Sequence, residues 1–172
     1  MFDSMDIADY FVSSSLKQGI KINNLKLQKL LYYFYAMKLV NGNGNPFNEK
    51  FEKWQYGPVL PSVYHSYKQY YGADINEVPD RYTFDVDSNS FKRKTFDDSK
   101  LPEELKKEIE TFVFNLKNYD AFELVERTHR HDDWKNDEEK IQAGFQHIEY
   151  DDNITADFFR RHVEEQLWHQ EI

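Results

Sequence analysis

The stretch from residue 25 to residue 40, LKLQKLLYYFYAMKLV, constrains the fold more than any other part of the chain. Leu27, Leu30, Leu31 and Phe34 recur at helical spacing, and other large apolar side chains fill most of the remaining circumference. A helix that is apolar nearly all round is usually buried in a core. The stretch is too short to span a membrane, and its lysines and glutamine interrupt the apolar surface. We therefore predict a central helix that its neighbours surround.

Helical patterns elsewhere predict a mostly α-helical fold around this central helix. Expected helices cover residues 4–18, 61–71, 102–118, 120–130, 137–144 and 155–168. Their expected N-caps include Ser4, Asn23 or Asn24, and Thr155. Phe122 and Val163 are expected on buried sides. With no linker between two cores, residues 1–172 are predicted to form a single compact domain.

Two short β elements are expected beside the helices. Residues 51–56 alternate aromatic and polar side chains and predict a short extended piece, which Gly57 and Pro58 should end. The polar stretch 73–99 contains two alternating runs around Asp87-Ser88-Asn89-Ser90, which predicts a small hairpin within an insert.

Composition excludes several classes of function. A formal net charge of -9 argues against a nucleic-acid binder, because phosphate binding needs a positive face. The absence of cysteine excludes disulfides, zinc–thiolate sites and a cysteine nucleophile. No secretion signal is recognisable at the start of the sequence, so a cytoplasmic location is expected.

One polar cluster, Thr128-His129-Arg130-His131-Asp132-Asp133-Trp134, could carry chemistry. A metal-assisted hydrolase using His129, His131 and Asp132 is one interpretation, although it needs a further separate ligand. The alternative is a helix end where the basic side chains interact with the helix dipole. Lys29 lies on an otherwise apolar helix, and it is expected either to reach solvent or to pair with a carboxylate.

The sequence WQYGPVLPSVY, residues 54–64, predicts a rigid turn that launches a helix. Trp54 and Tyr64 are expected to close over this turn. With 12 Tyr and 3 Trp, the chain has more such rings than one small core readily hides, and these residues dominate binding hot spots. We expect an aromatic, acid-rimmed partner-binding surface with these candidates: Trp54, Tyr56, Tyr67 and Tyr71.

Together these motifs resemble a known family. LKLQKLLYY, WQYGPVLPSVY, the Thr128-His129 pair ahead of Trp134 and the opening DIADYF are similar to the Panacea domain of SocA-like and phage-associated GepA-type proteins. The resemblance runs from about residue 5 to residue 165. Two departures are Asp132-Asp133, where a proline is common, and residues 73–99, which match no motif. The motif positions, expected to be mainly structural, are Leu27, Lys29, Leu30, Tyr32, Trp54, Gly57, Pro58, Val59, Tyr64, His129 and Trp134.

The resemblance implies a non-enzymatic antitoxin that neutralises a cognate toxin by direct protein–protein binding. An alternative within the family is a proteolytic adaptor that delivers its toxin to a protease. The family implies no cofactor and no catalytic residue. Some members carry an extra DNA-binding segment, and since none is recognised here, direct nucleic-acid binding is not expected. No membrane partner is expected either.

Overall fold

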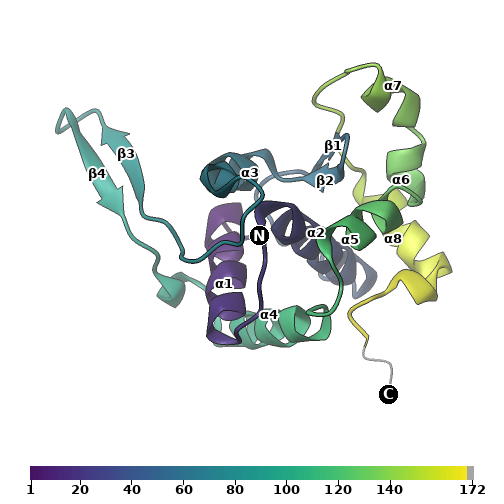
Figure 1. The fold of residues 1–172 in the computed structure, drawn as a ribbon, viewed down its shortest axis with the longest axis horizontal. Coiled ribbons are helices and arrows are strands. Elements are labelled where there is room, and N and C mark those ends of the chain that lie inside the picture. Colours follow the sequence, from purple (N-terminus) through teal and green to yellow (C-terminus); the bar gives the residue numbers. More distant parts are fainter. Residues whose placement is uncertain (170–172) are drawn as a thin grey trace.

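The computed structural model describes residues 1–169, and its elements are mostly helices (Figure 1). The two sheets are antiparallel pairs of short strands. The predicted mostly α-helical fold with a small β-hairpin is therefore confirmed. The α-helices are α1 (Ser4–Lys17), α2 (Asn24–Val40), α3 (Pro61–Tyr67), α4 (Glu103–Asn115), α5 (Ala121–Thr128), α6 (Asp132–Lys135), α7 (Glu138–Gln142) and α8 (Asp152–Arg161). The short 3-10 helices are η1 (Lys68–Tyr70), η2 (Asp98–Lys100) and η3 (Val163–Glu165), and the strands are β1 (Glu52–Trp54), β2 (Gly57–Val59), β3 (Arg81–Asp85) and β4 (Ser90–Lys94).

Helix α2 is the buried centre of the molecule, as its sequence predicts. It contacts α1, α3, α5, α8 and β2, and most of its side chains are buried. Asn23 caps its first turn by accepting a hydrogen bond from the Lys26 amide at 2.8 Å. Within residues 1–169, no helix has both the length and the apolar character needed to cross a membrane.

The core around α2 is built largely from aromatic rings. Phe34 of α2 meets Phe11 of α1 and Phe112 of α4 edge to face, with ring centroids 5.4 and 5.3 Å apart. This edge-to-face geometry is favourable for aromatic pairs. Tyr35 buries its ring but donates its hydroxyl to Asp152 at 2.6 Å, which satisfies the polar end of the side chain. The aromatic composition thus serves the interior as well as the surface.

Several local predictions are wrong at helix ends. Asp3, not Ser4, caps α1, because its carboxylate accepts from the Met5 amide while Ser4 is already helical and bonds Asn48. Asp151, not Thr155, caps α8; Thr155 is buried and its hydroxyl lies 3.3 Å from Asp133.

The last predicted helix starts and stops earlier than its sequence pattern indicates. α8 ends at Arg161, a 3-10 turn follows, and Val163 is exposed rather than buried. Phe122 is 64% exposed, because the short helix α5 turns Leu124 and Val125 inward instead. Helix α3 likewise ends at Tyr67, before the predicted position. These errors concern short helices, where few residues define the buried face.

The predicted hairpin is confirmed, and it projects beyond α1 and α3 as an arm (Figure 1). Its strands β3 and β4 pair in a register that sets Phe84 opposite Phe91. Residues 98–100 and α4 then bring the chain back alongside α1.

Candidate functional site

The β1–β2 turn is the local structure around which the sequence motifs assemble. Gly57 and Pro58 do not end the extended piece; they form β2, which pairs with β1 so that Trp54 lies opposite Gly57. Gly57 has a φ of +91°, and a Cβ there would lie 2.6 Å from the Thr128 hydroxyl oxygen. Only glycine combines this backbone conformation with so close an approach.

Lys29 lies directly beneath this turn, fully buried. Its side-chain nitrogen donates to the carbonyl of Pro58 at 3.0 Å, and no carboxylate forms an ion pair with it among the described residues. The prediction that it reaches solvent or pairs with a carboxylate is therefore wrong. Burial without a counter-charge lowers the pKa of Lys29 to about 7. The lysine thus holds β2 against α2 through a main-chain carbonyl.

The Thr128–Trp134 segment supports the turn from its other side. The ring of His129 stacks on Trp134 with centroids 4.0 Å apart, and the Trp134 indole N–H donates to the Trp54 carbonyl at 2.9 Å. Burial lowers the pKa of His129, which favours the neutral ring that packs there. These contacts support the prediction that His129 is structural.

The proposed metal ligands do not come together. His131 is buried elsewhere, with Nδ1 3.3 Å from the Tyr32 hydroxyl and Nε2 3.6 Å from Glu165. Asp132 instead accepts from Arg161 at 2.6 Å. In the described part of the chain, no group of three or more His, Asp or Glu side chains is placed to hold an ion. The metal-hydrolase interpretation therefore lacks its ligand set.

A buried ion pair that sequence reasoning missed connects this segment to β1. Lys53 contacts the carboxylate of Asp133, and Asp137 accepts from the same ammonium at 2.8 Å. Asp133 also accepts from the Asp151 amide at 2.7 Å. The only sequence signal was an acidic residue where the family commonly has proline, which does not identify its partner.

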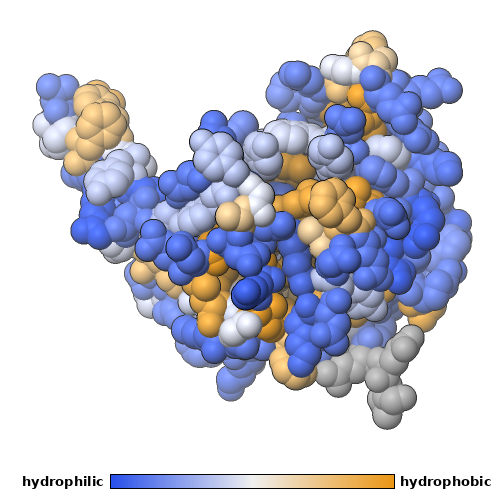
Figure 2. All heavy atoms as spheres, viewed as in Figure 1, coloured by the Kyte–Doolittle hydropathy of each residue, from blue (hydrophilic) through white to orange (hydrophobic). Residues whose placement is uncertain are grey.

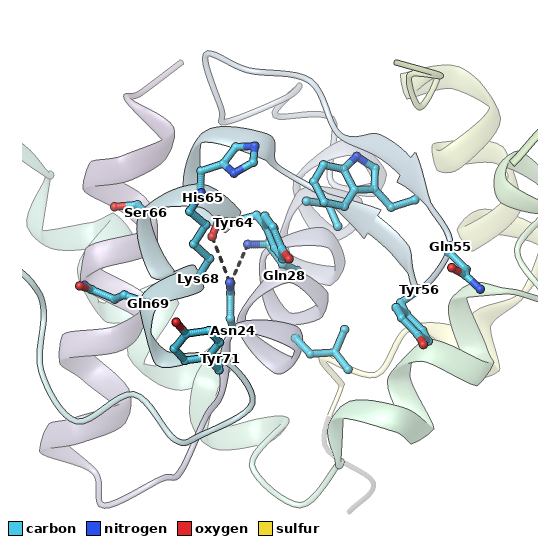
Figure 3. A pocket seen from close by; sticks show the side chains of 13 residues that line it. Asn24, Gln28, Gln55, Tyr56, Tyr64, His65, Ser66, Lys68, Gln69 and Tyr71 are labelled. Carbon is cyan, nitrogen blue, oxygen red and sulfur yellow. Dashed lines mark hydrogen bonds between the residues drawn. The ribbon is translucent and has the colours of Figure 1, made fainter. Parts of the chain in front are cut away.

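Beside the turn lies a cleft of about 890 Å³ between the start of α2, the β1–β2 turn and α3–η1 (Figure 3). Trp54 and Tyr64, which were expected to close over the turn, pack edge to face with ring centroids 4.9 Å apart, and both rings line the cleft. Asn24 donates to the Tyr64 carbonyl at 3.1 Å, and Gln28 accepts from the Leu60 amide at 2.9 Å. These two α2 amides connect α2 to both walls of the cleft. The sequence predicted Asn24 only as a possible N-cap and gave Gln28 no role, and the N-cap is Asn23. The lining residues are Asn24, Leu25, Gln28, Trp54, Gln55, Tyr56, Val59, Tyr64, His65, Ser66, Lys68, Gln69 and Tyr71.

Three of the four aromatic candidates for partner binding line this cleft. Tyr56 and Tyr71 are 56% and 87% exposed, and Trp54 is partly exposed. Tyr67 is wrong as a surface candidate, because it is fully buried and donates its hydroxyl to Asp9 at 2.7 Å. The lining contains Lys68 but no aspartate or glutamate. The expected acidic rim is therefore absent from the cleft lining itself.

Comparison with known proteins agrees with this arrangement of motifs. The family model described as "Antitoxin SocA-like, Panacea domain" matches residues 27–135, which include most of α2, the β1–β2 turn, most of the cleft lining and the Thr128–Trp134 segment. The chain belongs to this family. It is also 39% identical over 62 residues to Antitoxin SocA of Caulobacter vibrioides (strain NA1000 / CB15N), a match that covers 36% of this chain. That match spans only 33% of the length of the curated relative. No solved structure matches the chain.

Within the family region, several of the motif residues are buried or support the turn. Leu27, Leu30 and Tyr32 are buried in the core, while Lys29 and Gly57 fix β2 on α2. The motifs therefore build a scaffold for the turn, and the cleft is the exposed feature that this scaffold shapes.

Proposed function

We propose that the protein is an antitoxin that neutralises a cognate toxin by binding it through the cleft beside the β1–β2 turn. The observation that carries this proposal is the convergence of the family motifs on that turn. Lys29, Gly57 and Trp134 hold it rigidly, and the turn presents Trp54 and Tyr56 to the cleft. Rigid aromatic side chains around a concave site bind at a low entropic cost.

The cleft has dimensions suited to receiving protruding side chains of a partner. Its volume of about 890 Å³ and its ring-lined walls allow apolar groups to be buried. The amides of Asn24 and Gln28 are already engaged with the Tyr64 carbonyl and the Leu60 amide, so the cleft keeps its shape without a ligand. A preformed cleft of this kind supports binding of the toxin by a folded surface of this chain rather than by a disordered tail.

The test uses a growth-arresting protein encoded in the adjacent reading frame, co-expressed with the full chain. Replacing both Tyr56 and Tyr71 by alanine should abolish rescue of growth while leaving the melting temperature within about 2 °C of wild type, since both rings are exposed. Phe114→Ala, an exposed ring on α4 outside the cleft, is the matched control and should rescue normally. Normal rescue by the double tyrosine variant would contradict the proposal.

The same experiment separates masking from delivery to a protease. Under masking, the toxin persists at undiminished levels beside the wild-type chain. Under the adaptor alternative, the toxin level falls in cells that contain the protease and is restored in protease-deficient cells. Quantifying the toxin by immunoblot in both backgrounds decides between them.

A further inference from the structure

The β3–β4 hairpin lacks the packing that normally stabilises a sheet. Its two strands pair only with each other, and it extends away from the helices (Figure 1). Across residues 1–169, no backbone hydrogen bond joins either outer edge to another element. An isolated two-stranded hairpin is marginally stable in water. A partner that covers it would supply the missing contacts.

The two faces of the hairpin differ in chemistry. Tyr82 and Phe84 share one face with their cross-strand partners Arg93 and Phe91. The rings of Phe84 and Phe91 are 5.3 Å apart, and all three aromatic residues are more than half exposed. Figure 2 shows apolar residues on this arm beside hydrophilic ones. A contiguous exposed aromatic patch of this kind marks an interaction site.

The opposite face anchors the hairpin to the helices. Arg81 forms an ion pair with Asp9 of α1 and donates to the Ser66 hydroxyl of α3 at 2.6 Å, while Lys94 lies 3.9 Å from Asp6. The remaining cations of the strands are also paired, Lys92 with Asp85 and Arg93 with Asp80. The aromatic face therefore carries little unbalanced charge, which favours an uncharged apolar protein surface as its occupant.

The position of the Arg81 anchor indicates which protein would cover the aromatic face of the hairpin. Ser66, to which Arg81 donates, also lines the cleft, so the root of the hairpin is fixed to the cleft wall. A second copy of this chain is disfavoured, because each copy carries a net charge of -9 and the three rings are far smaller than a stable dimer interface of about 800 Å² per partner.

We propose that the hairpin is a second docking arm for the protein that occupies the cleft. Its aromatic face, formed by Tyr82, Phe84 and Phe91, covers an uncharged apolar patch on that toxin. This inference rests on the proposed function. Two linked contacts on one partner raise the affinity beyond that of either alone, because the second contact forms within the encounter complex.

The test measures the Kd of the full chain for the purified toxin by isothermal titration calorimetry. The double variant Phe84→Ser, Phe91→Ser should raise the Kd about tenfold or more, as loss of buried aromatic anchors does. Thr83→Ala on the opposite face is the control and should leave the Kd unchanged. A Kd within twofold of wild type for the double variant overturns the proposal. The proposal is also overturned if sedimentation shows that the wild-type chain alone is a dimer and that the folded double variant is a monomer, because the hairpin would then bind a second copy of the chain.

Comparison with the Tyr56→Ala, Tyr71→Ala variant keeps the two proposals distinct. Weakened binding by both variants supports both contacts. Weakened binding by the tyrosine variant alone overturns the docking arm and keeps the cleft. Weakened binding by the hairpin variant alone overturns the cleft as the toxin site and, with it, the two-contact arrangement.

Discussion

At the scale of single residues, Lys29 gives the clearest link between burial and a measurable property. Its pKa is about 7 in the folded protein because of burial, against about 10.5 unfolded. Between these values the unfolded chain binds more protons, so the free energy of unfolding rises with pH, by up to about 1.4 kcal/mol per pH unit. We expect this rise between pH 7 and 9 in urea titrations, and Lys29→Met should remove it.

The exposed lysine of α4 provides the control for that measurement. Lys107→Met should keep the same slope as wild type, because Lys107 lies at the surface. A slope that survives in Lys29→Met would show that another group causes the pH dependence. His131, whose pKa burial lowers, titrates below this window and does not obscure the result.

At the scale of elements, the β1–β2 turn depends on Gly57 for space as well as for conformation. Gly57→Ala adds a Cβ 2.6 Å from the Thr128 hydroxyl at a positive φ, whereas Gly42→Ala has a similar φ of +76° and meets nothing within 4 Å. We expect Gly57→Ala to destabilise the protein by about 2–4 kcal/mol and Gly42→Ala by about 1 kcal/mol. Thermal or urea unfolding measures both, and equal costs would show that packing under the turn contributes nothing.

Elements also show where sequence reasoning works and where it does not. The long helix α2 was predictable because its apolar positions repeat over many turns, and the hairpin was predictable because its strands alternate around a polar turn. Tyr67 was wrongly predicted at the surface because the sequence does not show whether a tyrosine hydroxyl bonds to solvent or to a side chain inside the protein. In the structure, the hydroxyl of the buried Tyr67 donates to Asp9. The hydrogen bond from Lys29 to the Pro58 carbonyl was unpredictable because every residue carries a main-chain carbonyl, so the sequence does not single out one acceptor.

The cleft itself depends on contacts between segments distant in sequence. The contact between Trp54 and Tyr64 was predictable because only nine residues, which include a rigid turn, separate them in the sequence. The amides of Asn24 and Gln28, which fix the cleft walls from α2, resemble ordinary polar positions of a buried helix. Their role becomes visible only when the fold places α2 beneath the turn.

At the scale of the whole molecule, charge and contact chemistry are separated in space. The chain carries 31 acidic and 22 basic residues, yet no acidic side chain lines the cleft. The negative field therefore acts at long range, while the contacts in the cleft are aromatic and amide groups. Such a field accelerates encounter with a basic toxin and contributes little to the affinity of the final complex.

This separation predicts how salt affects binding of a basic toxin. Raising the ionic strength from about 0.05 to about 0.3 M shortens the screening length from roughly 14 to roughly 6 Å, so the association rate should fall several-fold. The dissociation rate should change much less, because the cleft contacts involve few charges. Stopped-flow association and dissociation measured on the same complex test this. A salt effect confined to dissociation would instead locate ion pairs within the interface, and would require contacts outside the acid-free cleft.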